Sequence, residues 1–178
     1  MGVRGDDSAI RADLIALYEA LDRELARIGP RCEISGRCCR FAQYGHMLFL
    51  STVEAEYLAE APPPGDVARS SQQCPYQQGV LCTARERRPL GCRVFFCDPA
   101  YAPFMQEIAE RYTRALKAIV AKHGREWCYG PLPAILKTVL EAEGNGTTGG
   151  CSPAESAGAT GSAVEGGADR SGGPRGTR

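Results

Sequence analysis

Three cysteine-bearing motifs lie close together in the chain: CEISGRCC at 32–39, CPYQQGVLC at 74–82 and RPLGCRVFFC at 88–97. They hold most of the nine cysteines among the 178 residues. Their cysteines are Cys32, Cys38, Cys39, Cys74, Cys82, Cys92 and Cys97. The flanking sequence has the pattern of ordinary helices and a tail, so these motifs carry most of the information about fold and chemistry.

Turn residues inside the motifs predict a loop-rich region. Gly36 lets the backbone wrap tightly before the adjacent cysteine pair. Gly79 lies inside the second motif, which predicts a small hairpin with its two sulfurs at one end. Pro89 fits the second position of a type I turn, so we expect Cys92 to follow a stiff corner.

The cysteines favour metal binding over disulfides. The N-terminal residues lack the apolar core of a signal peptide, and no stretch approaches the ~20 apolar residues of a membrane span. We therefore expect a cytoplasmic protein, whose thiols are kept reduced. The odd number of cysteines also argues against complete pairing. A redox or disulfide switch and buried inert thiols are the alternatives.

All seven motif cysteines are predicted metal ligands. Thiolates select zinc, copper(I) or the iron of iron–sulfur clusters, and we expect zinc or iron, the latter as an ion or as a cluster. Seven thiols suffice for one four-ligand site with spares, or for two metals that share sulfurs. Neighbouring side chains in an extended chain point apart, so the pair Cys38 and Cys39 favours bridged metals or a cluster unless the backbone turns there.

The turn residues also rank the ligands. The strongest predicted ligands are Cys38, Cys39, Cys82 and Cys92, followed by Cys32, Cys74 and Cys97. Cys128 beside Trp127 is interpreted as a core residue, and Cys151 as a free thiol in the tail. Neither is a predicted ligand.

Arginines crowd the same stretch. They are Arg37, Arg40, Arg85, Arg87, Arg88 and Arg93. Thiolates on a divalent metal leave excess negative charge, which guanidinium groups offset from a second shell. We predict this role for Arg88 and Arg93. A solvated basic face, or a site for an anion or an acidic partner, is the alternative.

Apolar residues recur at helical spacing on both sides of the motifs. The stripe over 10–28 predicts a helix that Gly29 and Pro30 stop. The stripe over 104–123 predicts a second long helix, and 132–140 a short last one.

The segment between the first two motifs predicts mixed structure. Residues 41–50 form an apolar segment that we expect to be extended, and Ser51 with Glu54 fits a capping box for a short helix that ends before the prolines at 62–64. The predicted fold is therefore α+β and helix-dominated: a small, metal-stapled, cysteine-rich domain with short strands and a hairpin.

Composition divides the chain into a domain and a tail. Residues 1–143 form the predicted metal-binding domain, with the cluster core at 32–97. Residues 144–178 are rich in Gly, Ser, Ala and Thr and lack an apolar period, so we expect them to be disordered.

Charge and motifs exclude several function classes. The formal net charge is zero and the pI about 6.7, which disfavours nucleic acid or an anionic membrane as a partner. Neither His46 nor His123 lies in a recognisable nucleophile motif, and no phosphate-binding loop is present, so no catalytic residue is predicted. Whether the protein is an enzyme stays open, with binding favoured.

The order and spacing of these pieces resemble the YkgJ-type cysteine-cluster family, over residues 32–97. That family's first motif commonly reads CxxCGxCC, and this chain has Ser35 at the second cysteine position, which removes one ligand. Cys97 is the candidate to compensate for it. The resemblance implies chelation of zinc or iron.

We therefore expect a cytoplasmic metal-binding protein, acting as a metal-handling or interaction module whose protein partner is not indicated. A related cysteine cluster occurs in the flagellin lysine methyltransferase, so the alternative is a cluster-dependent enzyme, either a protein methyltransferase or an oxidoreductase. A pocket with convergent polar groups beside the metal would favour the enzyme.

Overall fold

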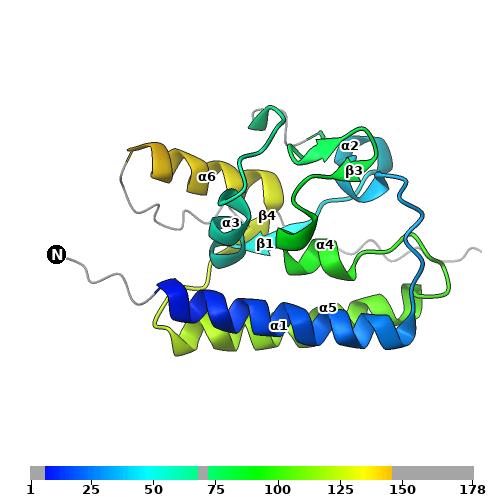
Figure 1. The fold of residues 1–178 in the computed structure, drawn as a ribbon, viewed down its shortest axis with the longest axis horizontal. Coiled ribbons are helices and arrows are strands. Elements are labelled where there is room, and N and C mark those ends of the chain that lie inside the picture. Colours follow the sequence, from blue (N-terminus) through cyan, green and yellow to red (C-terminus); the bar gives the residue numbers. More distant parts are fainter. Residues whose placement is uncertain (1–6, 68–71, 146–178) are drawn as a thin grey trace, which may run out of the picture.

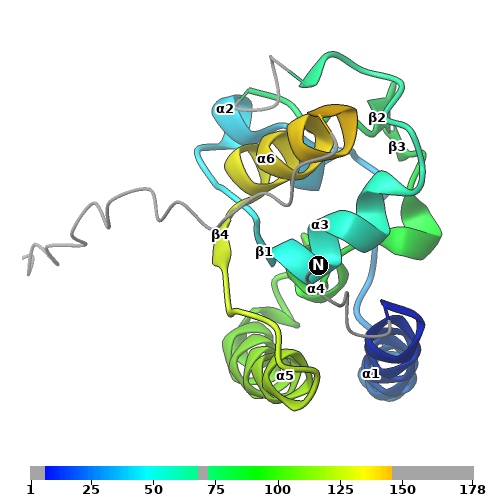
Figure 2. The same ribbon diagram turned by 90° about the vertical axis from the view of Figure 1, so that its left-hand side faces the viewer.

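Two long helices form the base of the molecule. The structure, a computed structural model, describes residues 7–67 and 72–145. Helix α1 (Asp7–Ile28) and helix α5 (Ala102–Lys122) lie side by side in both views (Figure 1, Figure 2). Each turns its apolar stripe towards the other and towards the rest of the chain, as their periodicity predicts.

Ion pairs show that these two helices run antiparallel. Asp13 near the start of α1 pairs with His123, just beyond the end of α5, at 2.7 Å. Glu24 near the end of α1 accepts hydrogen bonds from Arg111 and from Tyr112, the latter at 2.9 Å. The pairs lie along the edge of the helix interface, outside the apolar seam.

A second group of elements packs above this pair. It contains β1 (Phe49–Ser51), α3 (Thr52–Ala59), β4 (Tyr129–Pro131) and α6 (Leu132–Asn145). Strands β1 and β4 are antiparallel, with Leu50 opposite Gly130. Figure 2 shows α6 on the side of this ribbon that faces away from α1 and α5, with α3 beside β1.

The cysteine motifs form the remaining short elements. They are η1 (Arg37–Cys39), α2 (Phe41–Tyr44), β2 (Gln77–Gln78), β3 (Leu81–Cys82), η3 (Arg85–Arg87) and α4 (Leu90–Val94). Strands β2 and β3 pair as an antiparallel hairpin, with Gln77 opposite Cys82. Gly79 takes a φ of 61° in its turn.

The apolar residues divide into two buried clusters. One joins α1, α5 and α4 and includes Leu21, Leu90 and Leu116. The other joins α2, β1, α3 and α6 and takes in Cys39 and Cys74. The cysteine-rich stretch therefore lies against a hydrophobic core and is not an isolated loop.

Much of the predicted architecture is confirmed. The described residues are helix-dominated with short antiparallel strand pairs, which is an α+β arrangement. The two long helices, the hairpin and the capping box are present. Ser51 Oγ accepts from the Glu54 amide, and the Glu54 carboxylate accepts from the Ser51 amide.

Three local expectations were wrong. Residues 41–50 were expected to be extended, but 41–44 form α2, because Gly45 at a φ of 61° can close a helical turn. Pro89 has ψ 165° and lies outside a type I turn; it precedes the helix α4, which carries Cys92. Helix α6 continues to Asn145, beyond the predicted end at 140.

Some predictions concern residues outside the described ranges. The predicted tail is outside them from residue 146 onwards, including Cys151. Within the described ranges, no helix is both long and apolar enough to cross a bilayer.

Candidate metal centre

All seven motif cysteines line one cavity of about 120 Å³. The other walls are mostly apolar and include Leu58, Tyr76 and Phe95. The fold thus brings together thiols that are separated by as many as 65 positions in the chain.

Five of these thiols form an inner group. It consists of Cys38, Cys39, Cys74, Cys82 and Cys92. The sulfurs of Cys38 and Cys39 are 3.8 Å apart, and the thiols of Cys74 and Cys82 lie near enough to Cys39 to change its ionisation. Cys92 lies near enough to Cys38, Cys74 and Cys82 for their charges to act on it.

The other two thiols, Cys32 and Cys97, form an outer group. Cys32 is exposed and Cys97 is partly buried. The Cys97 sulfur is 3.9 Å from the hydroxyl oxygen of Ser35, and the neighbouring Asp98 accepts a hydrogen bond from the Arg31 amide at 3.0 Å. Cys97 therefore lies beside Ser35, the position for which it was expected to compensate.

The adjacent pair can face one cavity because the backbone turns. Gly36 has a φ of 69°, and the 3-10 turn η1 follows it directly. A Cβ at position 36 would lie 2.5 Å from the amide nitrogen of Gln77 and 3.1 Å from Val80 Cα, so glycine also lets the hairpin pack closely. The side-chain Nε2 of Gln77 donates to the Gly36 carbonyl at 3.2 Å.

Backbone hydrogen bonds fix the second motif against the first. The Cys74 amide donates to the Cys39 carbonyl at 2.7 Å. Thr83, next to Cys82, donates from its amide to the Tyr76 carbonyl at 2.8 Å. The hairpin therefore holds its cysteines beside the adjacent pair.

Helix α4 delivers Cys92 from the opposite side. The Leu90 amide at its start donates to the buried Glu54 carboxylate at 2.7 Å. Gly91 lies against β1, where a Cβ would be 2.8 Å from the Phe49 carbonyl oxygen. The sequence RPLGC thus has glycine where a helix touches a strand backbone.

The inner thiols differ in acidity. The hydrogen bond from Cys39 lowers the pKa of Cys38 to about 7 and that of Cys82 to about 6. The same contact, with those to Cys74 and Cys82, raises the pKa of Cys39. Burial, followed by the neighbouring sulfurs, raises the pKa of Cys92. Because Cys39 has a single S–H to donate, it favours a thiolate at Cys38 or at Cys82, one at a time.

The two arginines predicted to support the thiols lie in different places. Arg88, together with Arg85, lies beside the cluster and helps to lower the pKa of Cys82. Within the described residues, neither guanidinium forms an ion pair with a carboxylate. Their charge is thus available to the thiols.

Arg93, in contrast, is 6% exposed and points towards helix α1. Its guanidinium donates to Asp22 at 2.6 Å and to the carbonyls of Arg88 and Glu86, each at 2.7 Å. It also lies over the ring of Tyr18, 4.2 Å from the centroid. These contacts anchor α4 to α1.

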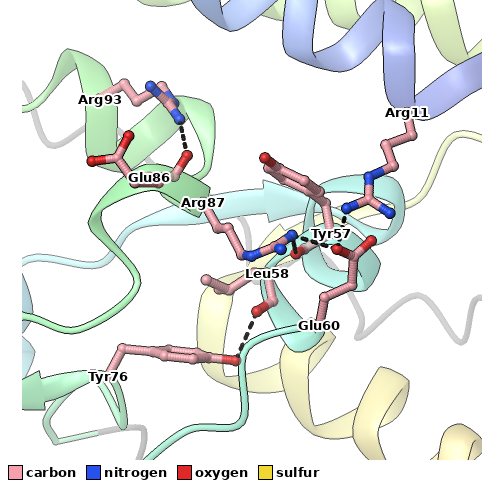
Figure 3. A network of polar contacts seen from close by, with 8 residues as sticks. All are labelled: Arg11, Tyr57, Leu58, Glu60, Tyr76, Glu86, Arg87 and Arg93. Carbon is pink, nitrogen blue, oxygen red and sulfur yellow. Dashed lines mark hydrogen bonds and ion pairs between the residues drawn. The ribbon is translucent and has the colours of Figure 1, made fainter.

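A polar network anchors the segment between Cys82 and α4 (Figure 3). Glu60, at the end of α3, pairs with Arg87 of η3 and with Arg11 of α1. Both guanidinium groups lie over the Tyr57 ring. The hydroxyl of Tyr76 donates to the Leu58 carbonyl at 3.2 Å, as Figure 3 also shows.

Sequence reasoning missed the acidic anchors of the site. Glu54 was recognised only as a capping residue, yet it also binds the start of α4. Asp22 and Glu60 lie on helical surfaces that periodicity assigns to solvent, so no signal in the sequence distinguished them.

The remaining predicted residues take structural positions. His46 contacts the Cys38 carbonyl at 3.3 Å and stacks on Phe95, with ring centroids 5.1 Å apart. His123 belongs to the pairing of α1 with α5. Cys128 is buried and does not line the cavity.

The thiols are gathered but do not form a finished ligand set. Among the described residues, no three His, Cys, Asp or Glu side chains are arranged so that they could hold a metal ion as they stand. Comparison of the chain with protein-family models, with curated proteins and with solved structures gave no match.

Proposed function

We propose that the protein binds zinc or iron through the inner group of thiols. The observation that carries this proposal is the 3.8 Å separation of the Cys38 and Cys39 sulfurs, in a cavity that the other motif cysteines also line. A tetrahedron with metal–sulfur bonds of about 2.3 Å has edges of about 3.8 Å. One edge of such a site is therefore already spaced for coordination.

Charge balance supports the same proposal. Four thiolates on a divalent ion carry a net charge of about −2, which costs free energy in a partly buried cavity. Arg85 and Arg88 lie beside the cluster without carboxylate partners among the described residues. Their two positive charges offset that excess.

Completing the site requires side-chain rotation within an existing frame. Turns and hydrogen bonds fix the backbone at the adjacent pair and at the hairpin, so rotation about χ1 is the freedom that the thiols retain. The inner group has one thiol more than a tetrahedral ion needs. Cys97 beside Ser35 is a further candidate ligand for a second metal or a cluster.

The 3.8 Å spacing fits two thiolates on one tetrahedral metal, as in a zinc site or at each iron of a [2Fe–2S] cluster, whereas each cysteine of a [4Fe–4S] cluster binds a different iron. Zinc, which needs no inorganic sulfide, is the first candidate metal, and an iron–sulfur cluster that recruits the outer thiols is the second. The resemblance to the YkgJ-type family adds support for both metals.

The role that we propose is a cytoplasmic metal-handling or interaction module. Besides the thiols, the cavity is lined mainly by apolar side chains, and neither histidine reaches it. This lining favours binding over the alternative of a cluster-dependent enzyme, which would need convergent polar groups for a substrate.

Metal analysis of protein purified without oxygen tests the proposal. We expect about one zinc per chain with a featureless visible spectrum; a brown chromophore with iron would identify the cluster instead. Cys39→Ser should lower the metal content, whereas Val120→Ala, a change in α5 away from the cavity, should leave it unchanged. Parent protein without zinc or iron, even after reconstitution under reducing conditions, would refute metal binding.

A further inference from the structure

Glu54 has no exposed surface, yet it carries a carboxyl group. One oxygen accepts hydrogen bonds from the Tyr18 hydroxyl at 3.0 Å and from the Leu90 amide at 2.7 Å. The other accepts from the amide and the hydroxyl of Ser51, at 2.7 and 3.0 Å. Its donors come from α1, from β1 and from α4.

Each oxygen of Glu54 faces one backbone amide, and a backbone amide can only donate, so both oxygens must accept. A carboxylate offers about four lone-pair positions, and here each of its two oxygens accepts two hydrogen bonds. An amide in the same place would turn an N–H towards one pair of donors. The site is therefore specific for a carboxylate and not merely for a side chain of this size.

The Leu90 hydrogen bond connects Glu54 to the thiol cluster. The first amides of a helix have no partner within the helix, so an external acceptor fixes where α4 begins. Cys92 follows two residues later, and its amide donates to the Pro89 carbonyl at 2.9 Å. A shift of the Leu90 amide would therefore carry the Cys92 sulfur with it.

The other end of α4 is held through the same tyrosine. Arg93 lies over the Tyr18 ring and pairs with Asp22 of α1, while the Tyr18 hydroxyl binds Glu54. Gly91 fixes the distance of α4 from β1. The short helix is thus held between α1, β1 and α3, with Glu54 as the link to its first amide.

We propose that Glu54 is a positioning residue for the thiol cluster: its carboxylate fixes the first amide of α4 and thereby places the Cys92 sulfur against Cys38, Cys74 and Cys82. The inference rests on the proposed metal binding, in which Cys92 is a ligand. Glu54 itself does not line the cavity and does not touch the metal.

Cobalt(II) binding to the full chain provides the test, because its thiolate absorption reports how many sulfurs coordinate the ion. We expect Glu54→Gln to weaken cobalt binding by about tenfold or more, the effect of losing a charge-assisted hydrogen bond. Cys92 should become alkylated faster than in the parent, with and without cobalt, while Cys38 keeps its relative rate. The control Val120→Ala removes buried apolar volume from α5 and no hydrogen bond, so it should lower stability and leave both readouts unchanged.

The outcomes separate the two ideas. Parent protein that binds no cobalt refutes the proposed metal site and the positioning role with it. Parent-like absorption and Cys92 alkylation in Glu54→Gln refute the positioning role alone. If that variant does not fold, Glu54→Asp keeps the charge and the cap at Ser51 but withdraws the oxygens from Leu90. It should show the same selective exposure of Cys92, and parent-like protection would again refute the role.

Discussion

Gly91 shows how closely the cysteine motifs are fitted to their surroundings. Its position has no room for a Cβ, which would meet the Phe49 carbonyl oxygen at 2.8 Å. Backbone atoms of β1 cannot swing aside as a flexible side chain can, so any larger residue must push α4 away from the ribbon.

We therefore expect Gly91→Ala to lower the free energy of unfolding by about 1 to 3 kcal/mol. Chemical denaturation of parent and variant measures the difference. Gly79→Ala is the contrast, because that glycine has a φ of 61° but open space around it and should cost about 1 kcal/mol. Equal losses in the two variants would mean that the contact with Phe49 relaxes freely.

Two arginines of one motif should respond differently to removal. Arg93→Met removes a buried guanidinium from a half-exposed Asp22 and leaves two carbonyls without their donor, so we expect a loss of about 2 kcal/mol in stability. Arg88→Met should change stability by less than about 1 kcal/mol but weaken zinc binding, because it removes positive charge beside Cys82. Zinc titration of the two folded variants tests this difference between Arg88 and Arg93. Weaker zinc binding by Arg93→Met and parent-like binding by Arg88→Met would contradict it.

For single residues, the sequence predicts which side chains can bind a metal better than it predicts which residues they contact. The identity of the thiols and the turn at Gly36 follow from residue type and local geometry. The direction of Arg93 does not, because it depends on Asp22 and Tyr18, which lie about 70 positions earlier in the chain.

Among the elements, the antiparallel pair α1 and α5 depends on acidic residues with altered ionisation. Hydrogen bonds from Lys122 and His123 lower the pKa of Asp13, and those from Arg111 and Tyr112 lower the pKa of Glu24. A lowered pKa in the folded state means that the folded protein holds these protons more weakly than the unfolded chain does.

Stability from these carboxylates should be fully present above the unfolded pKa of about 4 and be lost as the pH falls through the lower folded values. Thermal unfolding of Asp13→Asn with Glu24→Gln should therefore differ most from the parent near pH 7 and least below about pH 3. Added salt should reduce the difference, because the pairs are partly exposed. A difference that persists at low pH would point to lost packing.

Periodicity predicts the long helices of this fold but not its short elements. The stripes of α1 and α5 extend over many turns, so tertiary contacts cannot easily override them. Helices α2 and α4 are four and five residues long, and they form because Gly45 and Glu54 complete their ends. The pairing of β1 with β4 joins residues about 80 positions apart, which no local pattern reveals.

The two hydrophobic clusters of the molecule depend on the cysteines to different degrees. Cys39 and Cys74 belong to the cluster with β1, α3 and α6, whereas the cluster between α1 and α5 contains no cysteine among its buried members. Loss of a bound metal would thus first destabilise the cluster that contains Cys39 and Cys74.

A chelator should accordingly increase amide hydrogen exchange between residues 32 and 97 while the amides in the middle of α1 and α5 stay protected. Hydrogen exchange followed by mass spectrometry, with and without chelator, measures both regions at once. Uniform loss of protection would show that the clusters unfold together, and an unchanged pattern would remove any structural role for the metal.

The aromatic stack along the β1–β4 ribbon has a practical consequence for such experiments. Trp127, the single tryptophan of the chain, stacks on Tyr129 with centroids 5.4 Å apart, and Tyr129 stacks in turn on Phe49 of β1. The fluorophore therefore lies beside the seam at which β4 pairs with β1. Its emission wavelength responds to the solvent that reaches this stack, so it gives a built-in optical signal for separation of the two strands, without any introduced label.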